Sequence, residues 1–159
     1  MRRDFFQLCT QLAAKDFDIS VIAFSNKEDI GSEIVEGVKI YKLPLILNIP
    51  AIVYPIPNIA ALFKTTINLI KKIKPDIIHM WDYIFPNAFT SFLLKNKNIF
   101  PPLILTTDCL PGISWFWGNK FVDFIAKAYT LTIGKKILQS QDLLVLLSEY
   151  SGATLCAGP

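Results

Sequence analysis

Short apolar segments alternate with helix-like segments along most of this 159-residue sequence, and this alternation constrains the fold more than any other feature. Apolar runs that suit buried strands lie at residues 18–25 (DISVIAFS), 76–80 (DIIHM), 102–107 (PLILTT) and 143–148 (LLVLLS). Helical periodicity predicts helices near the N-terminus and over residues 59–73, 88–97 and 120–138, with another beginning at Glu149. This pattern is typical of a parallel sheet covered by helices on both faces. We therefore expect an α/β fold forming one domain over residues 1–159.

A proline-rich region interrupts this pattern before the second helix. The segment EGVKIYKLP predicts a short strand that is entered through Gly37 and ended by Pro44. The following segment, residues 43–63, carries no charge and is long enough to cross a bilayer, but it holds Pro44, Pro50, Pro55 and Pro57. Each interior proline costs a helix roughly 3 kcal/mol. We interpret the segment as an apolar loop, either a buried connection or a lip that touches lipid or an apolar substrate.

Composition narrows the class of protein. Hydrophobic residues make up 52% of the chain and charged residues 18%, so much of the sequence should be buried or rest on an apolar surface. A net charge of +3 gives no support to nucleic-acid binding. The three scattered cysteines form neither a disulfide framework nor a metal-ligand spacing, and the N-terminus lacks the apolar core of a signal peptide. We expect a cytoplasmic protein, either free or peripheral at the inner face of the membrane.

Polar side chains follow the predicted strands at their carboxyl ends. These are His79, Asp82, Thr107, Asp108 and Ser148. Ligands of open α/β sheets bind at this edge, so the sequence predicts that these residues converge on one crevice. A single histidine and the lack of paired metal ligands argue against a zinc site and against a Ser-His-Asp hydrolase. No glycine-rich nucleotide loop is present either.

Aromatic residues surround the two aspartates of this predicted crevice, in the stretches WDYIFP and TDCLPGISWFWG. Grooves lined by aromatic rings and a few carboxylates suit sugars, because the rings stack on CH faces and the acids bind hydroxyls. The patch Trp115, Phe116 and Trp117 has two interpretations. It packs in the core, or it forms a loop that contacts the acceptor or a membrane, since tryptophan favours polar-apolar boundaries.

Four stretches, taken together, resemble a known family. KKIKPDIIHMWDYIFP, LILTTDCLPGISWFWG, AYTLTIGKKIL and DLLVLLSEYSGATL are similar, in the right order, to landmarks of the N-terminal domain of GT-B glycosyltransferases of family 4. The resemblance covers nearly the whole chain. It implies a Rossmann-like N-terminal half of a GT-B fold. It also implies a hexosyltransferase that moves a sugar from a nucleotide-sugar donor to a glycan or lipid-linked acceptor, with retention and without a metal or other cofactor.

The resemblance also implies roles for individual residues. Asp108 would be catalytic, and the acceptor would be bound by His79, Trp81, Asp82, Tyr83, Thr107 and Trp115. Two of these positions depart from the family pattern, because Trp81 and Asp108 stand where histidines are usual. An ionised aspartate cannot donate a hydrogen bond to a phosphate oxygen, but it can still bind a sugar hydroxyl. His79 has an alternative structural role at the strand end, and Asp108 an alternative role as a turn cap.

Further departures concern the ends of the chain. The family's first strand with its glycine-rich loop and its C-terminal donor domain are not in this sequence. We therefore expect a fragment that supplies the acceptor side of the cleft and is inactive without a partner polypeptide or a longer chain. The alternatives are a non-catalytic binding module or inert remnant of the same fold and, less favoured, half of a nucleotide-sugar epimerase.

Overall fold

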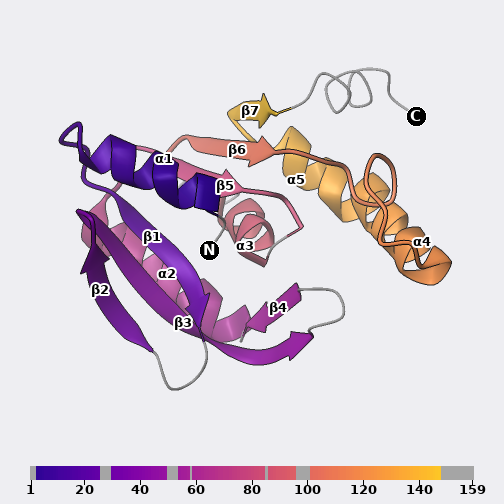
Figure 1. The fold of residues 1–159 in the computed structure, drawn as a ribbon, viewed down its shortest axis with the longest axis horizontal. Coiled ribbons are helices and arrows are strands. Elements are labelled where there is room, and N and C mark those ends of the chain that lie inside the picture. Colours follow the sequence, from indigo (N-terminus) through magenta and orange to yellow (C-terminus); the bar gives the residue numbers. More distant parts are fainter. Residues whose placement is uncertain are drawn as a thin grey trace. The chain divides into compact units, whose positions relative to one another are not determined.

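The computed structural model describes the chain as two compact units, Met1–Lys64 and Thr65–Pro159 (Figure 1). Within them it describes residues 3–25, 30–49, 54–57, 59–84, 86–95 and 101–147. Among these residues, no helix is both long enough and apolar enough to cross a membrane. Ser148 of the predicted crevice and the last helix expected from Glu149 onward lie outside the described residues.

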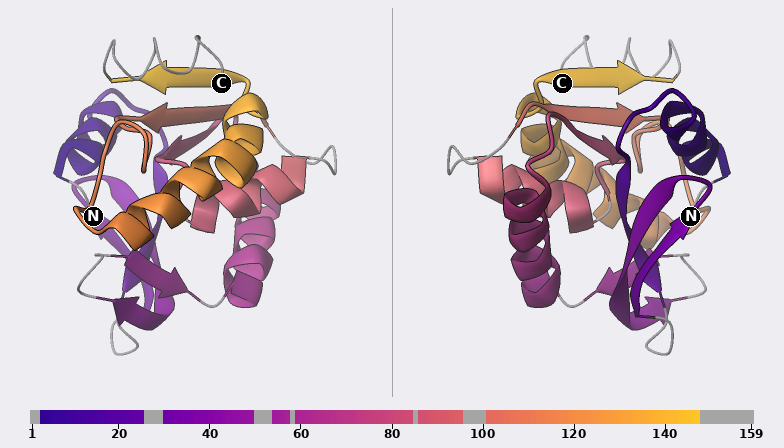
Figure 2. Two further views of the ribbon diagram at one scale, coloured as in Figure 1. Left: turned by 90° about the vertical axis from the view of Figure 1, so that its right-hand side faces the viewer. Right: turned by 90° about the vertical axis from the view of Figure 1, so that its left-hand side faces the viewer.

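The first unit combines one helix with a mixed sheet. Helix α1 (Arg3–Ala13) is followed by strands β1 (Ser20–Ser25), β2 (Gly31–Val35), β3 (Val38–Ile49) and β4 (Tyr54–Pro57). Strand β3 pairs in parallel with β1 and antiparallel with β2 and β4 (Figure 2). A small core of Cys9, Val21, Val38 and Ile40 lies between the helix and this sheet.

The proline-rich region differs from its sequence-based prediction. Strand β3 does not stop at Pro44 but continues to Ile49, and β4 pairs with its far end where a loop was expected. At Pro44 the antiparallel partner β2 has already ended, since its pairing with β3 stops at Lys42. The missing N–H of Pro44 therefore interrupts no ladder on that side. The two prolines of β4 lie in a strand that, among the described residues, pairs with β3 alone.

Strand β2 was not predicted, because its sequence GSEIV is short and mostly exposed. It joins β3 through Glu36 and Gly37, which both have positive φ angles of 50° and 80°. Two consecutive residues in this conformation form the tight turn that suits a two-residue hairpin. The backbone freedom of Gly37 thus creates the hairpin.

Helix α2 (Ile59–Ile73) carries the chain from the first unit into the second. Leu62 and Thr66, one turn apart, are its buried residues. The helix is followed by Lys74 in the left-handed conformation (φ 51°) and by Pro75, which cannot continue a helix. The predicted bounds of this helix are those of the structure.

The second unit is built on a parallel sheet of β5 (Ile78–Trp81), β6 (Leu103–Thr107) and β7 (Leu143–Leu146), in that order. Helix α3 (Pro86–Lys95) connects β5 to β6. A longer helical segment connects β6 to β7 and consists of α4 (Lys120–Tyr129), the π-helical turn η2 (Thr130–Gly134) and α5 (Lys135–Gln139). The predicted α/β class with parallel, helix-connected strands is confirmed.

The core of the second unit centres on Tyr83, which is fully buried after the end of β5. A Cβ atom at Gly134 would lie 2.8 Å from Tyr83 Cε2, so the ring packs directly on the backbone of η2. The Tyr83 hydroxyl lies 3.0 Å from Thr130 Oγ1, which itself donates to the Pro111 carbonyl at 2.9 Å. Tyr129 stacks on the Tyr83 ring and donates to the Tyr83 carbonyl at 3.1 Å. The π-helical turn thus lies where the chain wraps around this ring.

We predict that Gly134→Ala destabilises the protein because its new methyl group would overlap the Tyr83 ring. The overlap costs about 1–3 kcal/mol, which outweighs the gain of about 1 kcal/mol from replacing a helical glycine by alanine. Urea unfolding followed by circular dichroism measures the difference. In a Tyr83→Leu background the ring is gone, so the same substitution should become neutral or stabilising; equal destabilisation in both backgrounds would contradict this packing.

A second prediction concerns Asp142, which joins two elements of this unit. It accepts a hydrogen bond from the Leu103 N–H at 2.8 Å and another from Lys95 Nζ at 3.0 Å. These contacts, the Leu103 amide first, lower the pKa of Asp142. A lowered folded-state pKa stabilises the protein above the unfolded pKa of about 3.9, and this contribution is lost as the pH falls through the lower value. Urea unfolding between about pH 2 and 6 should therefore show a weaker acid dependence for Asp142→Ala than for the unchanged chain.

Candidate functional site

The ends of β5 and β6 bring the predicted polar residues of the second unit to one edge. Trp81 pairs with Thr106, and the Asp82 N–H donates to the Thr106 carbonyl at 2.7 Å. Asp82 and Thr107 consequently leave the sheet side by side. This arrangement follows from the parallel register, which places the carboxyl ends of neighbouring strands together.

Asp82 makes a sharp turn directly after β5. Its φ angle is 71°, a conformation that aspartate tolerates better than most non-glycine residues. One carboxylate oxygen, Oδ1, accepts the Tyr83 N–H at 3.0 Å and the Thr107 hydroxyl at 3.3 Å. The residue is only 2% exposed. The local contacts therefore hold the Asp82 carboxylate inside the protein at the end of the sheet.

Asp108 and Cys109 complete a cluster with Asp82. One ligand atom from each of these three residues lies within 4.8 Å of the other two. Thr107 contacts two members of the cluster, because its hydroxyl lies 3.3 Å from Asp82 Oδ1 and 3.0 Å from the Cys109 carbonyl oxygen. Carboxylates accept hydrogen bonds from hydroxyl groups and bind cations, and a thiol adds a soft ligand. Asp108 is partly exposed as a residue, whereas Asp82 is buried, although Asp108 Oδ1 itself is also enclosed.

His79 lies on β5, three residues before Asp82, and its side chain is exposed. Its Nε2 lies 2.7 Å from Thr106 Oγ1, and its ring centroid lies 6.2 Å from that of Trp81. His79 and Trp81 alternate along the strand with Met80, which is buried in the core, so they belong to the opposite face of the sheet. Partial desolvation lowers the pKa of His79, which favours the neutral ring.

Two expected acceptor-binding residues lie elsewhere. Tyr83 is fully buried in the core, where burial raises the pKa of its hydroxyl, so it presents no surface to an acceptor in this conformation. Trp115 lies on the loop before α4, is largely exposed, and meets the Trp117 ring edge-on at a centroid distance of 4.1 Å. The structure thus brings together Asp82, Thr107 and Asp108, and joins His79 and Trp81 to the same strand ends through Thr106.

Sequence reasoning missed Thr106 and Cys109. Thr106 holds His79, and Cys109 contributes a sulfur to the aspartate cluster. Cys109 was considered only as one of three scattered cysteines. Its position directly after Asp108, at the end of a buried strand, was the signal that could have identified it. Thr106 carries no comparable signal, because its contact depends on the register between β5 and β6.

The family model described as "Glycosyl transferase 4-like" matches residues 5–136, which is well over half of the chain. None of the curated proteins matches the sequence.

The lowered pKa of His79 is directly testable, since this is the only histidine of the chain. We predict that an NMR titration gives one imidazole signal with a pKa below 6.5 in the folded protein. In urea, where desolvation is removed, the pKa should return to about 6.5. A folded-state pKa at or above the urea value would contradict the desolvation of this ring.

Proposed function

The chain belongs to the glycosyl transferase 4-like family, and we propose that it forms the acceptor side of a glycosyltransferase active site. In this proposal the complete enzyme transfers a hexosyl group, with retention, from a nucleotide-sugar donor to a glycan or lipid-linked acceptor. The donor is bound by a second, C-terminal domain. Closure of two domains over the substrates would exclude water and align the donor with the acceptor.

The observation that carries this proposal is the cluster of Asp82, Asp108 and Cys109 at the carboxyl ends of β5 and β6. Ligands of α/β folds bind at this edge. The two carboxyl groups differ in access, because Asp82 is buried and held by Tyr83 and Thr107, whereas Asp108 is partly exposed. We assign the contact with the reacting acceptor hydroxyl to Asp108, and to Asp82 the positioning of the loop that carries it.

Neighbouring side chains extend the proposed acceptor site. His79 and Trp81 both lie on β5, and the neutral imidazole of His79 can donate a hydrogen bond to a sugar hydroxyl or accept one from it. The Trp81 ring can stack on the CH face of a pyranose. In this assignment Tyr83 supports the site from the core rather than contacting the acceptor.

A second candidate function is a non-catalytic sugar-binding module. It is favoured by the hydrogen bonds that already occupy part of the cluster: Asp82 Oδ1 accepts two hydrogen bonds, and the Thr107 hydroxyl is directed at protein oxygens. Such a site can retain an acceptor without assisting a reaction. Acceptor binding without transfer in the presence of a donor-binding partner would identify this case.

The test compares acceptor binding by the chain and by two matched variants. Asp108→Asn should weaken binding of oligosaccharide or lipid-linked sugar probes by about tenfold or more, because hydrogen bonds to charged groups contribute about 1.5–3 kcal/mol. Asp76→Asn is the control, since Asp76 is exposed before the amino end of β5. Isothermal titration calorimetry measures both. Equal affinity of the two variants, or no binding by the unchanged chain, would overturn the acceptor-side assignment.

Transfer itself is measured as release of nucleoside diphosphate from a panel of nucleotide sugars, with the acceptor that binds best and with the donor-binding polypeptide supplied. Asp108→Asn should lower kcat more than the control substitution Asp76→Asn. If it changes KM alone, Asp108 binds the acceptor without taking part in the chemical step.

A further inference from the structure

Helix α4 of the second unit exposes its apolar residues. Phe121 and Phe124 are 72% and 70% exposed, Ile125 is also exposed, and so is Leu131 in the π-helical turn that follows. None of the residues of α4 is buried, although its sequence KFVDFIAKAY is strongly amphipathic. An amphipathic helix normally buries its apolar face, so this stripe of Phe121, Phe124, Ile125 and Leu131 requires an explanation.

The loop before α4 is fixed against the helix and adds to this apolar surface. The Cβ that Gly112 lacks would lie 2.4 Å from the Lys127 backbone nitrogen, so loop and helix backbones touch. The Trp117 N–H donates to Asp123 Oδ1 at 2.7 Å. Trp115 and Phe116, which are 42% and 57% exposed, are therefore held beside the stripe. A hollow of about 460 Å³ lies between loop and helix, lined by Gly112, Ile113, Phe116, Lys120, Asp123, Phe124 and Lys127.

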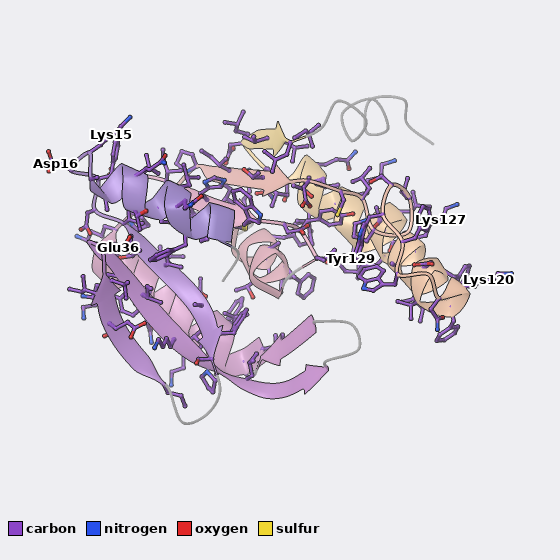
Figure 3. The ribbon with its side chains drawn as sticks, in the orientation of Figure 1. Lys15, Asp16, Glu36, Lys120, Lys127 and Tyr129 are labelled. Carbon is purple, nitrogen blue, oxygen red and sulfur yellow. The ribbon has the colours of Figure 1, made fainter. Side chains whose placement is uncertain are left out.

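Charges of one sign border this surface. Residues 115–139 contain four lysines, Lys120, Lys127, Lys135 and Lys136, which are all exposed. The only acidic residue of this segment is Asp123, and its carboxylate is directed at the Trp117 amide. Figure 3 shows the side chains of Lys120 and Lys127 extending away from the ribbon of α4. The apolar surface is therefore bordered by net positive charge.

We propose that α4 and the loop before it dock on the surface of an anionic lipid bilayer. The stripe would enter the boundary between headgroups and acyl chains, with Trp115 at the polar-apolar interface and the lysines among the anionic headgroups. The hollow is lined by Lys120, Lys127 and Asp123, so it offers apolar walls and net positive charge to one lipid. This inference goes beyond the proposed transfer reaction and does not depend on it.

The placement of the lysines favours lipid over a protein partner. Protein–protein interfaces are depleted in lysine, whereas Lys120 and Lys127 both line the hollow of this surface. Lysine stems can cover apolar surface while their ammonium groups reach headgroup phosphates. An anionic bilayer satisfies the exposed rings and the lysines together.

The proposal is tested by sedimentation of the 159-residue chain with phosphatidylcholine vesicles, with and without phosphatidylglycerol. The chain should bind the anionic vesicles, and added salt should weaken the binding. Phe121→Ser/Phe124→Ser should lower the partition coefficient by at least about tenfold, because two exposed rings no longer enter the bilayer. Lys120→Gln/Lys127→Gln should remove most of the preference for anionic vesicles. Blue-shifted tryptophan emission in a Trp81→Phe background reports insertion of the loop.

Matched control variants distinguish binding through this surface from nonspecific adsorption to vesicles. Ile34→Ser removes an equally exposed apolar side chain from β2, and Lys71→Gln/Lys72→Gln removes two exposed charges from α2. Circular dichroism checks that all variants are folded. The proposal is overturned if the chain does not bind anionic vesicles, or if control and test variants bind alike. It is also overturned if the phenylalanine variant only abolishes self-association in size exclusion and leaves vesicle binding unchanged.

Discussion

The packing of Tyr83 on Gly134 is the contact on which the second unit most depends. It fixes the end of β5 against the helical segment between β6 and β7, and the hydroxyl of Tyr83 adds Thr130 and through it the Pro111 loop. Because Asp82 is the preceding residue, its sharp turn and the direction of its carboxylate are set by the same contact. A buried aromatic residue thus helps to hold the polar cluster in place.

The two carboxyl groups of the cluster, those of Asp82 and Asp108, have different environments. Asp82 is enclosed and accepts hydrogen bonds from the chain itself, which limits its freedom to bind an outside molecule. Asp108 lies at the same edge but one residue beyond the strand, where solvent reaches it. Of the two neighbouring carboxyl groups, one is thus enclosed by the chain and one lies at the edge of the unit.

Much of the second unit could be predicted from sequence, because its strands are short apolar runs and its helices have clear periodicity. The meeting of Asp82, Thr107 and Asp108 was predictable for the same reason, since it needs only parallel strand ends. The burial of Tyr83 could not be predicted, because an aromatic residue within WDYIFP suits a groove as well as a core. Its packing depends on Gly134, which is far away in the sequence. In the first unit the prolines obscured β3 and β4, whose pairing depends on where β2 ends rather than on local propensity.

The helical segment from Lys120 to Gln139 connects the Tyr83 core with the exposed α4 stripe, because its C-terminal half is packed in the core and its N-terminal half is not. Its C-terminal half carries the buried residues Thr130, Gly134, Ile137 and Leu138, whereas no residue of α4 is buried. The π-helical turn lies at this change. One extra residue in a helical turn rotates everything that follows by about 100° relative to everything before it. The turn therefore allows one continuous helix to direct its later residues to the Tyr83 core while its earlier apolar residues face outward. The packing around Tyr83 that holds the polar cluster in place thus also leaves the α4 stripe exposed.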